Sequence, residues 1–419
     1  MKDFNKPISQ ELLNIEDKNR SNLFAWRGQF SPQLIECLLQ NYCPKNSIIL
    51  DPFAGSGTVL YEAAMNGLSA YGYEINPSAW SFCKLYEFSN LNKEVREDTI
   101  VELRDKIEAE FPIVVFSEEY LVPEEVEKRI IRVAESIDEN AKILCNALVV
   151  LLDVYKNRIT NNFVRNKYYA LAKLVRSLPY TEALIEADLQ DARCLPLRNQ
   201  CIDFVITSPP YINVFNYHQN YRRSVEILGW DVLRVAKSEI GSNRANRGNR
   251  FYTVVQYSID MASTLQELAR VLKPGGKAVF IVGHESKVLG VPFNNADIVE
   301  KISHDLGMFD LNLRQKRIFK NRFGQEIRED ILNLSRKAYR NDTDLPEIVG
   351  KKVSLNIMES SLKIVSDKNK QLLEQAIFRT ENLSGTPIFD SNSYAKYHTR
   401  EYVMMVNEEK RDIKWVETL

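Results

Sequence analysis

Short apolar runs and helix-like segments alternate in the first hundred residues. An apolar run at residues 48–50 precedes a turn with two glycines, and residues 58–65 have the apolar spacing of a helix that ends at Gly67. A second apolar run, residues 70–75, carries the acidic residue Glu74 near its end. This order predicts a strand, a glycine turn, a helix and a second strand, which together form a parallel crossover unit.

The same alternation returns after residue 180. Apolar runs at residues 183–187, 202–207 and 277–282 predict strands, and the spacing at residues 258–271 predicts a helix between the last two. A late run at residues 329–334 predicts an edge strand. The expected fold class is therefore α/β, a Rossmann-like core whose mostly parallel sheet has helices on both faces.

The segment between these two parts is strongly charged and has helical spacing. It predicts a helical insertion with helices over residues 101–111, 123–137, 141–155 and 166–178, because an unstructured loop of this length is rare in a compact fold. We expect five regions: an N-terminal tail (1–22), a first core half (23–95), the helical insertion (96–180), a second core half (181–338) and a C-terminal extension (339–419).

The composition is that of a folded globular protein, with 44% apolar and 26% charged residues. No stretch approaches the roughly 18 apolar residues that span a bilayer, and the six cysteines have no metal-ligand spacing. We therefore expect a soluble, cytoplasmic protein without a membrane segment, disulfide scaffold or metal site. Because the net charge is only −1, any nucleic-acid contact depends on local patches, and residues 234–250 and 314–322 are both rich in arginine and lysine. Each patch is equally compatible with a solvated surface.

The turn after the first strand has the sequence DPFAGSGT over residues 51–58. Two close glycines let backbone amides approach a ligand, but the Gly-Lys-Ser/Thr ending of a P-loop is absent and Leu60 replaces the third glycine of a dinucleotide fingerprint. The Asp51 carboxylate could accept hydrogen bonds from a cationic amino group, or it could cap the helix. Glu74 stands at the spacing of an acid that holds ribose hydroxyls.

The strand at residues 202–207 ends in Ser208-Pro209-Pro210-Tyr211. Two prolines fix the backbone where strand pairing must stop, so a backbone carbonyl and the Ser208 hydroxyl can converge as acceptors. Tyr211 adds a flat aromatic face. This corner is typical of a site that binds a planar amine.

With both motifs the chain resembles the S-adenosylmethionine-dependent amino-group DNA methyltransferases, which methylate cytosine N4 or adenine N6. The resemblance covers residues 23–95 and 181–338, and residues 27–34 resemble the family's motif before the glycine turn. It implies S-adenosylmethionine as the cofactor, and it implies cofactor-binding roles for Phe30, Ser31, Asp51, Pro52, Phe53, Ala54, Gly55, Gly57, Thr58, Glu74, Asp191 and Ala192. Within this set Asp191 would take the adenine amine. The implied catalytic residues are Ser208, Pro209, Pro210 and Tyr211.

The resemblance also implies double-stranded DNA as the substrate, with the target base flipped into the site. A serine before the two prolines favours cytosine N4 over adenine N6. The family further implies a restriction-modification system, whose cognate endonuclease need not form a stable complex with this protein. The predicted DNA contacts are Arg244, Arg247, Arg250, Arg314 and Arg317, and the recognition element could be the insertion, the 314–322 patch or the C-terminal extension. His218 is either a general base or a hydrogen-bonding residue of a substrate loop.

Two other functions remain open from the sequence. The first is an RNA or protein-glutamine N-methyltransferase, although relatives of these kinds carry Asp or Asn where this chain has Ser208. The second is a catalytically silent DNA-binding protein on the same scaffold. The intact Asp51, Gly55, Gly57 and Tyr211 argue against that reading.

Overall fold

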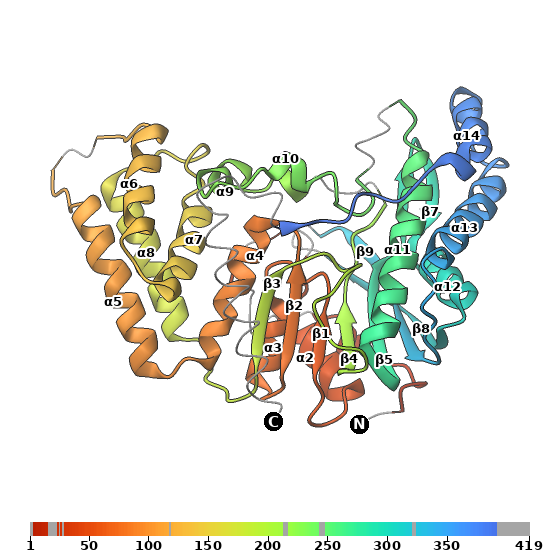
Figure 1. The fold of residues 1–419 in the computed structure, drawn as a ribbon, viewed down its shortest axis with the longest axis horizontal. Coiled ribbons are helices and arrows are strands. Elements are labelled where there is room, and N and C mark those ends of the chain that lie inside the picture. The colour runs from red at the N-terminus through yellow and green to blue at the C-terminus, as the bar shows by residue number, and fades with distance from the viewer. Residues whose placement is uncertain are drawn as a thin grey trace.

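The computed structural model describes residues 3–15, 23–24, 26, 29–116, 119–212, 217–242, 248–320 and 324–391 (Figure 1). Its centre is a seven-stranded sheet in the order β3-β2-β1-β4-β5-β9-β8. These strands are β1 (Ile49–Asp51), β2 (Ala70–Glu74), β3 (Ile185–Leu189), β4 (Ile202–Thr207), β5 (Leu272–Gly283), β8 (Phe309–Lys320) and β9 (Glu326–Arg336). The predicted α/β class is confirmed.

Strands β1 to β5 pair in parallel, whereas β9 is antiparallel to both of its neighbours. The chain passes from β1 outward through β2 to β3 and then returns to β4 on the other side of β1. This reversal makes β1 and β4 neighbours, with Leu50 opposite Val205. In open parallel sheets the crevice beside such a reversal, at the carboxyl ends of the strands, is where ligands bind.

Successive residues of the central strands face opposite cores. Ile49, Phe204 and Val279 belong to one apolar cluster, whereas their neighbours Leu50, Val205 and Phe280 belong to the other. Alternation of this kind within buried strands requires apolar cover on both faces of the sheet.

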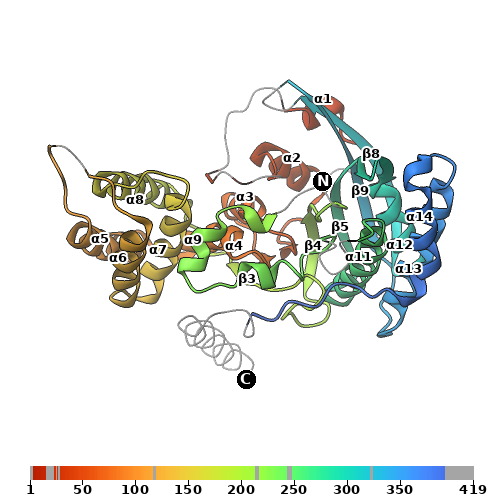
Figure 2. The ribbon, with the colours of Figure 1, turned by 90° about the horizontal axis from the view of Figure 1, so that it is seen from above.

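Helices provide this cover on each face (Figure 2). The first cluster includes residues of α2 (Pro32–Tyr42), α3 (Thr58–Met65) and α4 (Pro77–Cys83). The second includes residues of α11 (Tyr252–Val271), α12 (Asn295–Leu306), α13 (Leu345–Ser361) and α14 (Asp367–Arg379). The remaining short elements are α1 (Gln10–Leu13), η1 (Lys84–Asn90), η2 (Tyr217–Gln219), α9 (Arg222–Ile227), α10 (Val232–Val235), the hairpin β6 (Glu285–Val288) and β7 (Val291–Asn294), and η3 (Thr380–Asn382).

A group of helices projects from one end of the sheet, at the left of Figure 1. It consists of α5 (Lys93–Glu110), α6 (Pro123–Glu135), α7 (Glu139–Leu152) and α8 (Asn161–Arg176). The sequence placed the start of α5 at residue 101. The helix begins earlier because the Asn92 side chain caps it, accepting a hydrogen bond from Val95 N at 2.8 Å.

Buried Arg96 of α5 fastens this group to the rest of the chain. Its guanidinium donates to backbone carbonyls at the end of α8 and around η1, including Leu178 O and Phe88 O, both at 2.7 Å. Burial lowers the pKa of this arginine. The charge is thus held by carbonyl dipoles from two separate segments.

Three features of the second half differ from the sequence predictions. The predicted strand at 329–334 is part of β9, but its predicted edge position is wrong, because β8 pairs along the outer side of β9. Strand β5 begins at Leu272, earlier than the predicted strand at 277–282, and it has a register shift beside β4 between Ile202 and Phe204. The unassigned tail forms α13 and α14.

Within the described ranges, no helix combines the length and apolar character needed to cross a bilayer.

Replacing Arg96 with leucine should lower the free energy of unfolding by about 3 kcal/mol, because several buried carbonyls lose a charged donor. Urea denaturation measures this. Arg104→Leu is the matched control on the same helix, since Arg104 is exposed and pairs with Asp105, and it should cost less than about 0.5 kcal/mol. Equal losses in the two variants would contradict the anchoring role of Arg96.

Candidate active site

A single pocket lies at the carboxyl ends of β1, β2 and β4, where the sheet order predicts a ligand site. It brings together residues from both predicted motifs. The predicted residues that line it are Phe30, Pro52, Phe53, Ala54, Gly55, Thr58, Glu74, Asp191, Ala192, Ser208, Pro209, Pro210 and Tyr211. Three other predicted residues, Ser31, Asp51 and Gly57, are not part of the lining. Arg27 and Gly28, from the motif before the glycine turn, lie outside the described residues.

Asp51 is the last residue of β1 and is almost fully buried. Its Oδ1 accepts hydrogen bonds from Thr207 Oγ1 at 2.6 Å and from Phe53 N at 3.1 Å. Burial raises the pKa of this carboxyl to about 7, against the opposing effect of the two hydrogen bonds. Asp51 thus directly precedes the lining residues Pro52 and Phe53, and its buried carboxyl is costly to ionise without a positive partner.

Glu74 ends β2 and connects the glycine turn to the start of α4. Its Oε2 accepts from Gly55 N at 2.9 Å, and its Oε1 accepts from Asn76 N at 2.8 Å. Burial raises the pKa of this carboxyl to about 7, and the nearby charge of Glu239 adds to the shift. Burial thus raises the pKa of two carboxyls, Glu74 in the pocket lining and Asp51 beside it, to about 7, and such shifts are typical of functional sites.

The glycines of the turn are required by backbone geometry. Gly55 and Gly57 have φ angles of 53° and 88°, in the left-handed region that disfavours side chains. A Cβ at Gly57 would also lie 2.5 Å from the Tyr86 ring. The turn can therefore pack closely under the start of α3 only with glycine at this position.

The Ser208–Tyr211 corner forms the opposite wall. Tyr211 Oη lies 3.4 Å from Ser208 Oγ, and burial raises the pKa of the phenol, so it stays protonated at neutral pH. The tyrosine ring packs against Gly283 at the end of β5, where a Cβ would lie 2.8 Å from the ring. Gly283 thus makes room for the aromatic face.

Several pocket residues were not among the predicted ligand-binding residues: Trp26, Gln29, Ser56, Ile75, Asn76 and residues 238–242. Ile75 and Asn76 directly follow Glu74, so their proximity was available from the sequence. Trp26 lies against Gly55 and stacks on Tyr221, a contact between distant segments that no local pattern reveals.

Glu239 and Asn76 carry buried polar atoms without a hydrogen-bond partner among the described residues, namely Glu239 Oε1 and Asn76 Nδ2. The other carboxylate oxygen of Glu239 lies 3.3 Å from Nδ1 of buried His218. Among the described residues, Glu239 thus offers an unpaired acceptor to the pocket and Asn76 an unpaired donor. Leaving such atoms unpaired costs free energy, and a polar ligand could recover it.

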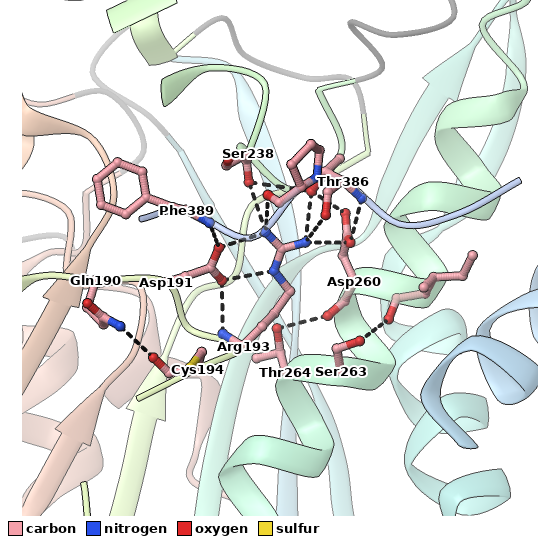
Figure 3. Close-up of polar contacts among 12 residues, drawn as sticks. Gln190, Asp191, Arg193, Cys194, Ser238, Asp260, Ser263, Thr264, Thr386 and Phe389 are labelled. Carbon is pink, nitrogen blue, oxygen red and sulfur yellow. Dashed lines mark hydrogen bonds and ion pairs between the residues drawn. The ribbon is translucent and has the colours of Figure 1, made fainter. Parts of the chain in front are cut away.

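Asp191 lines the pocket, but its carboxylate is occupied within the chain (Figure 3). Oδ1 accepts from Arg193 N and Nε, and Oδ2 accepts from Arg193 Nη2 and Phe389 N, at 2.7–3.0 Å. The expected hydrogen bond from this side chain to an adenine amine would have to compete with four existing ones. The role expected for Asp191 is therefore at odds with the geometry.

Two of the predicted DNA contacts face inward. Arg314 pairs with Asp297, Glu300 and Asp330 at 2.6–3.1 Å. Buried Arg317 pairs with Glu329 at 2.6 Å and donates to Leu13 O. Both guanidiniums pair with carboxylates around β8, so a contact from either one to a phosphate would have to replace an existing ion pair.

Of the remaining predicted DNA contacts, the structure describes Arg250, two residues before α11. Arg250 is exposed and stands shortly after the pocket residue Ser242. Arg244 and Arg247 lie outside the described residues. Over the part of the chain that the structure describes, no cluster of His, Cys, Asp or Glu could hold a metal ion.

Comparisons with known proteins agree with the motifs. A family model described as DNA methylase (N6_N4_Mtase) matches residues 5–85. The Type II methyltransferase M.BsoBI of Geobacillus stearothermophilus is 25% identical over 55% of this chain, and this chain spans just over half, 57%, of that relative. The Type II methyltransferase M.AvaI of Nostoc is 21% identical over 72% of this chain and 82% of its own length.

Among solved structures, an S-adenosylmethionine-dependent methyltransferase of Methanosarcina mazei aligns with 72% of this chain and 97% of its own, at 11% identity and a TM-score of 0.33. This likeness is too distant to add to the fold described above. The two motifs, their meeting in one pocket and the sequence matches lead to one conclusion: the chain is similar to the amino-group (N6/N4) DNA methylases.

Proposed function

We propose that this protein transfers a methyl group from S-adenosylmethionine to an exocyclic amine of a base flipped out of double-stranded DNA, with cytosine N4 favoured over adenine N6. One observation carries the proposal. Glu74, an acid that suits ribose hydroxyls, lines one pocket together with the Ser208–Tyr211 corner that suits a planar amine, and Asp51 lies beside that pocket, bonded to Thr207 directly before the corner. A methyl donor and its acceptor would therefore meet in one cavity.

The pocket fits the cofactor on its own chemistry. A cationic amino group would favour the charged form of buried Asp51, and ribose hydroxyls could donate to Glu74. The orphan atoms Asn76 Nδ2 and Glu239 Oε1 match a ligand that offers both acceptors and donors. When bound, S-adenosylmethionine supplies a methyl group made electrophilic by a positive sulfur.

The corner would act by orienting the amine. An exocyclic amine is a poor nucleophile because its lone pair is delocalised into the ring. Ser208 Oγ and the Pro209 carbonyl, accepting from its two N–H bonds, would favour a pyramidal nitrogen with the lone pair directed at the methyl group. The ring of Tyr211 would stack on the base and offset part of the cost of unpairing, which is a few kcal/mol.

Recognition of the target sequence would require surfaces outside the pocket. Arg250 is exposed and is one of the predicted phosphate contacts, whereas Arg314 and Arg317 would have to exchange carboxylate partners for phosphates. The helical group α5–α8 and the C-terminal extension are the candidate reading elements. Two relatives named as Type II methyltransferases support a place in a restriction-modification system, with a separate endonuclease that recognises the same site.

Incubation of the purified protein with labelled S-adenosylmethionine and unmethylated genomic DNA, followed by nucleoside mass spectrometry, tests the proposal. We expect N4-methylcytosine in the digest, and N6-methyladenine would instead identify the other amine of the family. Label in RNA or in protein glutamine would replace the proposal with the corresponding alternative. Absence of cofactor binding would favour a silent DNA-binding scaffold.

Tyr211→Ala should reduce kcat by about 10- to 100-fold, because stacking on a base contributes roughly 1–3 kcal/mol. The dissociation constant for S-adenosylmethionine should change less than about twofold, since Tyr211 follows β4 and is not part of the glycine turn. Single-turnover kinetics and calorimetry measure the two quantities. Tyr180→Ala, at an exposed tyrosine, is the matched control. Equal losses of cofactor affinity and turnover in Tyr211→Ala would refute this division of roles.

Asp51→Asn tests the negative charge of the Asp51 carboxylate, because an asparagine Oδ1 can keep both hydrogen bonds that Asp51 Oδ1 accepts. In the wild type, affinity for S-adenosylmethionine should rise as the pH increases through about 7, where Asp51 ionises and can pair with the amino group. The variant should bind more weakly and with a shallower dependence, the remaining slope coming from Glu74. Calorimetry between pH 5.5 and about 7.5 measures this, and an unchanged slope would argue against Asp51 as the partner.

The stability of the ligand-free protein provides the folding control for this variant. Burial raises the folded-state pKa of Asp51 above its ordinary value of 3.8, so this group contributes stability at low pH that is lost as the pH rises through about 7. Asp51→Asn should therefore be more stable than the wild type at pH 8, by an amount that disappears near pH 4.

A further inference from the structure

Arg193 joins segments that are far apart in the sequence (Figure 3). Its side chain is 2% exposed and pairs with Asp191 and with Asp260 of α11, each at 2.7 Å. Burying a guanidinium between two carboxylates is favourable only when the geometry is good and the remaining N–H groups are satisfied. Those N–H groups are satisfied by a third segment.

The third segment is the C-terminal strap, residues 383–391, drawn in blue where it crosses above the carboxyl ends of the central strands in Figure 1. Arg193 Nη1 donates to Thr386 O at 2.8 Å, and Nη2 donates to Pro387 O at 2.9 Å. In return, Thr386 N donates to Asp260 at 3.0 Å and Phe389 N donates to Asp191 at 2.9 Å.

The approach of the strap is close. A Cβ on Gly385 would lie 2.6 Å from Asp260 Oδ1, so glycine is required there for contact. Phe389 is 2% exposed and belongs to the apolar cluster on the α2–α4 side of the sheet. The strap is thus held by apolar burial at Phe389 and by a polar network around Thr386.

This network lies directly behind the wall of the active-site pocket. Asp191 and Ala192 line the pocket on one side of Arg193. Ser238, which begins the pocket-lining stretch 238–242, accepts from Arg193 Nη2 at 3.4 Å through its carbonyl. Two wall segments from different parts of the chain therefore share one guanidinium, and the strap completes the hydrogen bonding of that guanidinium.

We propose that Arg193 is a positioning residue of the cofactor site that couples docking of the strap to cofactor binding. With the strap displaced, Arg193 would keep buried donors without acceptors, and the Asp191 and Ser238 wall segments would lose their common support. Because such coupling is reciprocal, cofactor binding should also tighten the strap. The inference rests on the function proposed above for the pocket.

Thr386→Val tests the coupling, because it removes a hydroxyl that contacts Arg193 Nη1 and Asp260 Oδ2 at 2.9 Å and leaves the backbone bonds of the strap in place. We expect about 5- to 20-fold weaker binding of S-adenosylmethionine, with kcat at saturating cofactor within about twofold of wild type. Thr343→Val is the matched control, since the Thr343 hydroxyl contacts only exposed Asp344, at 3.5 Å.

Hydrogen exchange of the wild-type full-length chain gives a second readout that needs no variant to fold. The amides of Thr386 and Phe389 should exchange more slowly when S-adenosylmethionine is added, and Thr386→Val should reduce this effect. A lower melting temperature in Thr386→Val with wild-type cofactor affinity, or strap amides that do not respond to the cofactor, would overturn the coupling while leaving the proposed function intact. Failure of the wild type to bind the cofactor at all would overturn both.

Discussion

The hydrogen bond from Thr207 Oγ1 to Asp51 Oδ1 joins the two halves of this protein, and the site depends on it. Asp51 ends β1 and Thr207 ends β4, so a contact of 2.6 Å fixes the ends of two strands that are 156 residues apart. The glycine turn follows the first strand and the Ser208–Tyr211 corner follows the second. The sheet order, in which the chain leaves β1 on one side and returns on the other, makes this contact possible.

Forming the site requires the burial of carboxyl groups, which costs free energy when they are ionised. Asp51, Glu74 and Asp260 all have pKa values raised by burial, to about 7, 7 and 6. Asp260 is compensated within the chain by Arg193 and the strap, whereas no lysine or arginine among the described residues pairs with Asp51 or Glu74. This difference separates a structural carboxylate from two carboxylates that suit a ligand, because only the latter gain a partner when the pocket is filled.

The sequence predicted those elements that depend on interactions between residues close in the chain. Residues 202–207 form β4 as predicted, and both motifs stand where strand ends predict them. The edge-strand prediction failed because β8 carries many charged residues, and its pairing with β9 hides Arg314 and Arg317 among carboxylates from α12 and β9. Charge along a sequence shows that cations are present, but their partners depend on contacts between distant segments. The strap was missed for the same reason, since its only signal is a glycine and a few polar residues.

Asp191 shows how a motif residue can keep its place while its surroundings change its chemistry. The resemblance implies that it binds the adenine amine, yet its carboxylate accepts four hydrogen bonds from Arg193 and the strap. A carboxylate with four donors at 2.7–3.0 Å gains little from a fifth, because each donor must share the same lone pairs. The neighbouring pocket residue Glu239, by contrast, keeps an oxygen without a partner among the described residues. In this chain Asp191, the acid after β3, is therefore bonded to Arg193 and the strap. The oxygen without a partner belongs instead to Glu239, in the stretch 238–242 that Arg193 contacts through Ser238 O.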